Sequence, residues 1–297
     1  MHAKLGLEAN DVVGESLVWS AGDHALYWVD IGGKRVHRLE PTGGQHATWA
    51  TPDFPTSIGI RAKGGFIVGL RREVCLWEPG GVFRPIAIPE PDLPDNRLNE
   101  GIVAPDGSFW VGTMQNNLTD DGLSKAMSRD SGAYYRIAPD FRVARLTPRE
   151  YGITNTMAWL ADGRFITADT TKNILYAFDY DSSAATLSNR RVFASGFDRG
   201  LPDGSCVDAE GYLWNCRVVG GSCLARFAPD GRVDRIVELP CSWPTSCSFG
   251  GSDLSVLYVT SARFTMSDDH LAANPHEGAL FSIDVGKRGT TTYQFAG

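Results

Sequence analysis

One short strand pattern recurs six times along the chain, and this repeat restricts the possible folds more than any other feature of the sequence. Each copy is six residues long and rich in aromatic and β-branched side chains, as in Ala25–Asp30 and Val256–Ser261. A turn rich in Gly and Asp precedes each copy, and a further strand such as Arg35–Leu39 follows it. The copies begin at residues 25, 65, 108, 164, 212 and 256.

Repeats of this length that are built from short strands are typical of propeller blades. The six units span nearly the whole chain, so we expect residues 1–297 to form a single all-β domain, a six-bladed β-propeller. An antiparallel sandwich of many hairpins is the alternative, but it does not explain six copies of one three-part unit. Two units are longer than the others, between Gly112 and Gly132 and between Ser261 and Gly278, and insertions in repeats often border the functional face. For the second insertion a disordered surface loop is the competing interpretation.

The composition excludes several classes of partner. The 297 residues carry a net charge of −7, and their Lys and Arg residues are scattered, which gives no basic patch for nucleic acid. No apolar run is long enough to cross a membrane, and the N-terminus lacks the pattern of a secretory signal. We expect a soluble cytoplasmic protein, either a monomer or a weak homo-oligomer. The six cysteines show no metal-ligand spacing and read as buried, reduced thiols.

Polar residues recur at one position in the strand that precedes each turn, which we expect to be the innermost strand of each blade. Closure of the propeller brings equivalent positions of these strands toward the central axis. Two carboxylates at that centre would repel each other, and a bound cation would remove this penalty. Carboxylate and amide oxygens suit hard cations such as Ca²⁺, Mg²⁺ or Mn²⁺, although a merely hydrated polar ring is the alternative. The six residues are Glu15, Thr56, Asn99, Asn155, Asp203 and Thr245.

At these positions the sequence resembles the regucalcin/gluconolactonase family of metal-dependent sugar lactonases. Similar segments lie in order along nearly the full chain, among them Gly14–Trp19, Asn96–Gly101, Thr154-Asn155, Leu201–Gly204 and Leu257–Thr260. The resemblance implies one divalent metal ion on Glu15, Asn155 and Asp203, with Arg97 and Asn99 contacting substrate hydroxyls. Members of the family use Ca²⁺, Zn²⁺, Mn²⁺ or Fe²⁺, so the identity of the ion stays open.

One departure from the family bears on specificity. Some members have an acidic substrate contact shortly after Gly-Thr-Met, whereas this chain has the neutral residues Gln115, Asn116 and Asn117 there. We expect Asn117 to contact a sugar hydroxyl, and the preferred sugar to differ from that of those members. A surface salt bridge is the alternative role for Arg97.

The expected reaction is hydrolysis of an aldonolactone, a pentono- or hexonolactone, to the open aldonic acid. The metal would stabilise the oxyanion, and Asp203 would deprotonate the attacking water, with Glu15 as the other candidate base. A Ser-His-Asp hydrolase is disfavoured because the chain has no G-x-S-x-G motif. Two alternatives remain open: a non-catalytic propeller that binds a metal or ligand, and a propeller esterase or phosphotriesterase.

Overall fold

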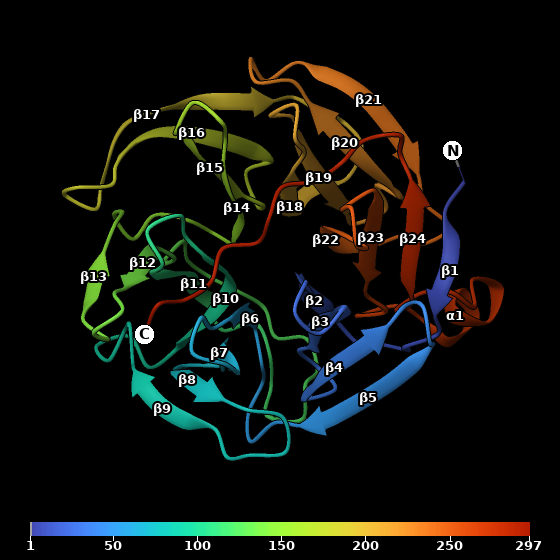
Figure 1. Cartoon of the computed structure of the whole chain (residues 1–297), viewed down its shortest axis with the longest axis horizontal. Helices are drawn as coiled ribbons and strands as arrows, with labels where there is room; N and C mark the ends of the chain where they lie inside the picture. The colour runs from blue at the N-terminus through green and yellow to red at the C-terminus, as the bar shows by residue number, and fades with distance from the viewer. Residues whose placement is uncertain (1) are drawn as a thin grey trace.

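The computed structural model describes residues 2–297, and it contains six four-stranded antiparallel sheets arranged around a central axis (Figure 1). The innermost strands β2, β6, β10, β14, β18 and β22 contact one another in that order, and β22 contacts β2, so the ring is closed. The architecture is a six-bladed β-propeller, which confirms the predicted fold class.

In five sheets the strands follow sequence order from the axis outward. The first two of these sheets are β2 (Gly14–Ser20), β3 (Ala25–Asp30), β4 (Arg35–Glu40), β5 (Gln45–Ala50), and β6 (Ser57–Ile60), β7 (Phe66–Gly69), β8 (Val74–Trp77), β9 (Arg84–Ala87). The next two are β10 (Asn96–Val103), β11 (Phe109–Gln115), β12 (Tyr134–Ile137), β13 (Val143–Arg145), and β14 (Thr154–Trp159), β15 (Phe165–Asp169), β16 (Ile174–Asp181), β17 (Thr186–Ser195).

The last two sheets join the two ends of the chain. The fifth is β18 (Leu201–Val207), β19 (Leu213–Val218), β20 (Cys223–Phe227), β21 (Val233–Glu238). The sixth runs outward through β22 (Pro244–Gly250), β23 (Val256–Ser261), β24 (Leu280–Asp284) and the N-terminal β1 (Lys4–Leu7). The N-terminal strand therefore supplies the outer edge of the last blade, and its pairing with β24 closes the propeller.

The second and third strands of every blade coincide with the repeat found in the sequence to within three residues at each end. Glycines with positive φ occupy the expected hairpin turns, among them Gly107 (75°), Gly163 (85°) and Gly211 (81°). The sequence pattern did not predict the fourth, outermost strands, because most of their residues are exposed and few large apolar side chains mark a buried face. The insertion 261–278 contains the short helix α1 (Asp268–Ala273).

The hydrophobic core is divided into six clusters, and each cluster lies between two neighbouring sheets. Large side chains fill these layers, and Trp28, Trp77, Trp110 and Trp214 are almost fully buried. Because the sheets pack face to face around the axis, only the innermost strands lie next to it. Their inward side chains line a central channel. Among residues 2–297 no helix is long and apolar enough to span a membrane.

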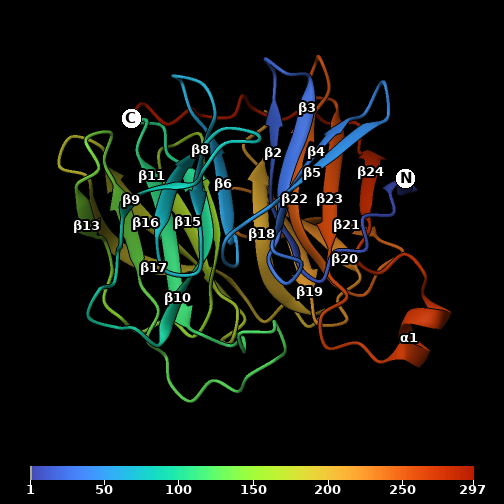
Figure 2. The same cartoon turned by 90° about the horizontal axis from the view of Figure 1, so that it is seen from below.

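The two faces of the propeller differ. In Figure 2 the loop between β11 and β12 and helix α1 lie on one face, whereas the C-terminal segment crosses the opposite face. That segment pairs with distant parts of the chain, since Gly289 bridges to Asp208 and Phe295 bridges to Arg61. It therefore ties the fifth blade to the second across the axis.

Candidate metal and substrate site

Five of the six polar residues of the predicted ring lie at irregularities of the innermost strands. The register of the first strand pair shifts beside Glu15, Asn99, Asn155, Asp203 and Thr245, in five of the six blades. A β-bulge turns a side chain away from the regular alternation and is common next to active sites. Ser16 and Thr156 have φ values of 55° and 54°, so the residues directly after Glu15 and Asn155 take up this distortion.

Asn155 is held in one orientation by Thr170 of its own blade. Its Nδ2 lies 2.9 Å from Thr170 Oγ1, and that hydroxyl donates its proton to Pro202 O at 2.8 Å. Because a hydroxyl has one proton, Thr170 can only accept from the amide, which fixes the nitrogen of Asn155 toward Thr170. The oxygen of Asn155 then faces the ring, where it accepts a hydrogen bond from Asn99 Nδ2 at 3.1 Å. An amide oxygen oriented in this way can bind a cation.

Arg97 joins the predicted substrate residues into one network. Its Nη1 donates to Asn99 Oδ1 at 2.7 Å, and its Nε donates to Asn117 Oδ1 at 3.0 Å. Arg97 is buried, with 6% of its surface exposed, so the structure does not place it in a surface salt bridge. Asn117 lies in the loop that follows β11, and the next residue, Leu118, is buried against the first and second blades. The first insertion therefore forms a wall of this face, as expected.

Three carboxylates share the channel with this arginine. Burial raises the pKa of Glu15 to about 8, while the backbone N–H of Ser16 and the charge of Arg97 act in the opposite direction. Burial also raises the pKa of Asp203 well above its usual value, and the charges of Glu15 and Glu100 raise it further. Burial likewise lowers the pKa of Arg97 to about 10.

Glu100 is a member of this group that the sequence analysis did not identify. Burial and the charge of Glu15 raise its pKa well above the usual value. It follows Asn99 directly within the bulge, whereas a regular strand would point two adjacent side chains to opposite faces. Only the bulge allows both residues to face the same group, which is why the alternation pattern did not reveal Glu100.

The donor set fits a divalent cation. Asp203 Oδ1 and Glu100 Oε2 are buried and have no hydrogen-bond partner among the described residues. Unpaired buried carboxylate oxygens are costly, and one cation satisfies several of them at once. The oxygens of Glu15, Asn155 and Asp203 are the hard ligands of Ca²⁺, Mg²⁺ or Mn²⁺. The hydroxyls of the two threonines of the ring instead donate to backbone carbonyls: Thr56 to Gly69 O and Thr245 to Gly14 O.

Residues 13–263 match the SMP-30/Gluconolactonase/LRE-like region. The chain belongs to this family. It is 35% identical over 290 residues to 6-deoxy-6-sulfogluconolactonase of Pseudomonas putida, with 96% of each chain covered. It is 33% identical to human regucalcin over 297 residues, covering 98% of this chain and 97% of that one.

Solved structures give the same result. The calcium-binding protein regucalcin from Agrobacterium tumefaciens superposes with a TM-score of 0.90 at 27% identity, covering 99% of this chain and 97% of that one. The resemblance to the regucalcin/gluconolactonase family is therefore confirmed. The ligand and substrate roles of individual residues stay predictions that the geometry supports.

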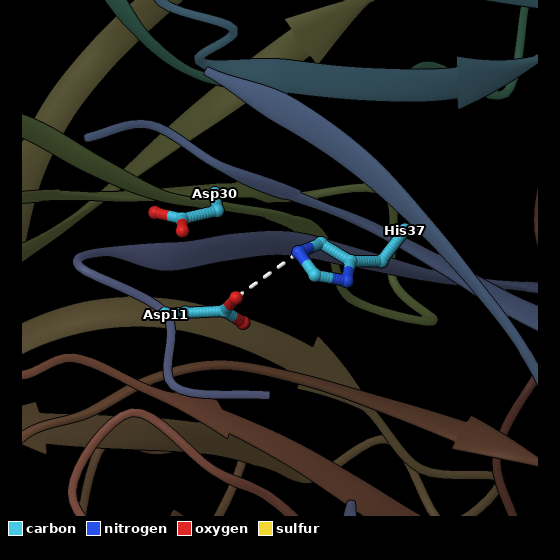
Figure 3. Close-up of side chains that lie close together, drawn as sticks. All are labelled: Asp11, Asp30 and His37. Atoms are coloured by element: carbon cyan, nitrogen blue, oxygen red, sulfur yellow. Dashed lines mark ion pairs between the residues drawn. The ribbon is translucent and has the colours of Figure 1, made fainter. Parts of the chain in front are cut away.

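A second buried acidic cluster lies within the first blade (Figure 3). Asp11 precedes β2, Asp30 ends β3, and His37 lies on β4, the third strand from the axis. One ligand atom from each residue lies within 4.8 Å of the others, a spacing that could hold a metal ion. Nothing in the sequence repeat marked these residues, because they come from three different positions of one blade.

In this cluster the chain itself supplies a positive charge. Arg35 Nη2 lies 3.0 Å from Asp30 Oδ2 and 3.4 Å from Asp11 Oδ1. Asp11 Oδ2 accepts from Trp28 Nε1 at 2.8 Å, and His37 Nε2 lies 3.0 Å from Asp11 Oδ1. The chain thus has two candidate cation sites. In the first blade Arg35 pairs with the carboxylates, and on the axis one oxygen each of Asp203 and Glu100 has no hydrogen-bond partner among the described residues.

Proposed function

We propose that this chain is a metal-dependent lactonase that hydrolyses an aldonolactone to the aldonic acid. The observation that carries the proposal is that Glu15, Asn155 and Asp203 all lie at bulged positions of innermost strands in three blades, with Asp203 Oδ1 buried and unpartnered among the described residues. The names of the relatives support it, since one curated relative is a sulfogluconolactonase and the matching family includes gluconolactonase.

Asp203 is the proposed general base. Its carboxylate can accept a proton from a water that attacks the lactone carbonyl carbon, and its burial raises its pKa and hence its basicity. Glu15 and Glu100 raise the pKa of Asp203 through their charges, so their ionisation affects the proton that Asp203 holds. Once the ring bond breaks, the protonated Asp203 can return that proton to the leaving ring oxygen.

The proposed cofactor is one divalent ion on Glu15, Asn155 and Asp203. When bound, Ca²⁺, Mg²⁺, Mn²⁺, Zn²⁺ or Fe²⁺ supplies Lewis-acid stabilisation of the negative charge that develops on the lactone carbonyl oxygen. Thr170 keeps the amide oxygen of Asn155 toward this position. The oxygen ligands favour a hard ion, but the family resemblance leaves its identity to measurement.

Arg97, Asn99 and Asn117 are the proposed substrate contacts. They form one hydrogen-bonded network beside the carboxylates. The network holds each side chain in a fixed orientation, so that the three can position the hydroxyls of one bound sugar. Their task is positioning, because the polyol part of a sugar lactone carries no charge that needs compensation. Asn117 carries a neutral amide, which can both donate to and accept from a hydroxyl. The acidic residue that some family members have near this position can only accept.

The test uses protein stripped of metal with a chelator and then reloaded with each ion separately. Pentonolactones, hexonolactones and a phosphotriester are compared at matched concentration, with spontaneous opening subtracted from each lactone rate. We expect metal-dependent acceleration for at least one aldonolactone and none for the phosphotriester. Equal rates with and without protein for every lactone and every ion would contradict the proposal, and preference for the phosphotriester would replace the substrate class.

A further inference from the structure

A cavity occupies the end of the channel opposite Glu15, Asn155 and Asp203. It is called the second cavity, to distinguish it from the metal and substrate site. Its volume is about 520 Å³, and its walls come from the C-terminal halves of innermost strands, with Met157, Trp159 and Phe249 among them. The C-terminal segment crosses this face of the propeller, and its residues 290–293 complete the lining (Figures 1 and 2). The cavity is separate from the ring because Glu15, Asn155 and Asp203 lie at the beginnings of the same strands.

Two thiols lie together in the wall of this cavity. Cys206 is on β18 and Cys247 is on β22, the innermost strands of the fifth and sixth blades, and both line the cavity. Their Sγ atoms are 3.5 Å apart. Cys206 is partly exposed and Cys247 is 3% exposed, so a small reagent that enters the cavity meets Cys206 beside a second thiol.

The other cysteines differ from this pair. All six cysteines are free, and Cys75, Cys216, Cys223 and Cys241 are buried and do not line the cavity. Cys216 also lies beside Cys247 and interacts with its thiol, but it is fully buried and does not line the cavity. Among residues 2–297, Cys206 and Cys247 are therefore the one pair of thiols that lie close together and also line a cavity.

We propose that Cys206 and Cys247 form an oxidisable dithiol, a modification site that closes to a disulfide when a peroxide enters the second cavity. The pair joins the innermost strands of two blades, and neither residue belongs to the metal and substrate site. The inference therefore does not depend on the lactonase activity.

The reaction balances with hydrogen peroxide as the oxidant. One thiol, as its thiolate, attacks a peroxide oxygen, the O–O bond breaks, and the sulfur becomes a sulfenic acid while hydroxide leaves and takes up the released proton as water. The second sulfur then attacks the sulfenic sulfur, and its proton leaves with the hydroxyl group as a second water. Two thiols and one hydrogen peroxide thus give one disulfide and two waters.

The experiment treats the native full chain with increasing hydrogen peroxide, blocks the remaining thiols, and maps peptides without reduction. Because tryptic peptides contain two cysteines each, fragment ions assign the linked pair. We expect a loss of two hydrogens in a species that links Cys206 to Cys247, reversal by dithiothreitol, and a higher melting temperature, since a cross-link restricts the unfolded chain.

Three variants provide the controls. Cys206→Ser and Cys247→Ser should each abolish the cross-link, whereas Cys216→Ser, which removes the neighbouring buried thiol, should leave it intact. If a variant folds poorly, peptide mapping of the oxidised wild-type protein still identifies which cysteines are linked. The proposal is overturned if peroxide leaves both thiols free at a dose that oxidises the partly exposed Met127 and Met266, or if the linked species contains Cys216 or Cys241 instead.

Discussion

The two buried acidic clusters of this protein, one on the axis and one in the first blade, solve the same electrostatic problem in different ways. In the blade, Asp11 and Asp30 face Arg35, His37 and Trp28, so the chain supplies positive charge and hydrogen-bond donors. On the axis, the charges of Arg97 and Arg217 act on the carboxylates of Glu15 and Asp203, and one oxygen each of Asp203 and Glu100 has no hydrogen-bond partner in the described chain. Removing one partner from a compensated pair of buried charges destabilises a fold, whereas buried charge that the chain leaves uncompensated marks a candidate ligand site.

Asp203→Asn tests the axial cluster and should have the largest effect. Loss of the base should lower kcat for the best lactone by roughly 10²–10⁴-fold, the usual contribution of a positioned proton acceptor. Metal content is measured in parallel by mass spectrometry. Asp11→Asn is the matched control from the blade cluster, and its kcat should stay close to that of the unmodified protein. Hydrolysis that survives Asp203→Asn with metal still bound would show that Asp203 is not the base.

Arg35→Met tests the blade cluster. Removing the guanidinium leaves two buried carboxylates without their ion pair, and the free energy of unfolding should fall by about 3 kcal/mol. This value is at the low end for a buried pair because the side chain of Arg35 is 33% exposed. Urea denaturation measures the change.

Arg38→Met is the control for that variant, since Arg38 lies on the same strand and pairs with Glu40 at 4.0 Å. It should lower the free energy of unfolding by less than about 1 kcal/mol, as for exposed ion pairs. If instead Arg35→Met gains a tightly bound metal ion that the unmodified protein lacks at this site, the blade cluster is a second cation site for which Arg35 competes.

Thr170→Val sharpens the role of orientation on the axis. The variant keeps the shape of the side chain but removes the acceptor that fixes the amide of Asn155, so cation affinity should fall by about 10-fold. Titration against a metal-sensitive dye measures the affinity. Thr171→Val is the control, because the neighbouring hydroxyl donates to Asp169 rather than to the ring. Equal affinities for the two variants would remove Thr170 from the site.

The pH dependence of the stripped protein should give the smallest effect. Burial raises the pKa of Glu15 to about 8, so between about pH 4.5 and 8 the folded chain binds more protons than the unfolded chain. Stability must therefore fall as the pH rises through this window. Melting temperatures of stripped protein should decline by a few degrees from pH 5 to pH 8, and saturating metal should remove the decline. A stripped protein that gains stability over this range would contradict the shift of Glu15.

Much of the fold followed from local pattern. The second and third strands of each blade carry alternating aromatic and β-branched residues and end at Gly and Asp turns, so periodicity located them. The outer strands could not be located in this way because strands such as Val143–Arg145 are exposed along their whole length and have no buried face. Pairing of β1 with β24 joins the two ends of the chain, and a contact at that separation leaves no local signal.

The sequence by itself determined the ring, because a repeat places equivalent residues at equivalent radii, and Glu15, Asn155 and Asp203 occupy one position of that repeat. Only the tertiary structure decided how their atoms are used. The bulge turns Glu100 toward the same group as Asn99, the hydroxyl of Thr170 connects Asn155 to Pro202 of the next blade, and Cys206 contacts Cys247 across two blades. Such contacts depend on how neighbouring sheets pack, and a one-dimensional pattern does not contain that information.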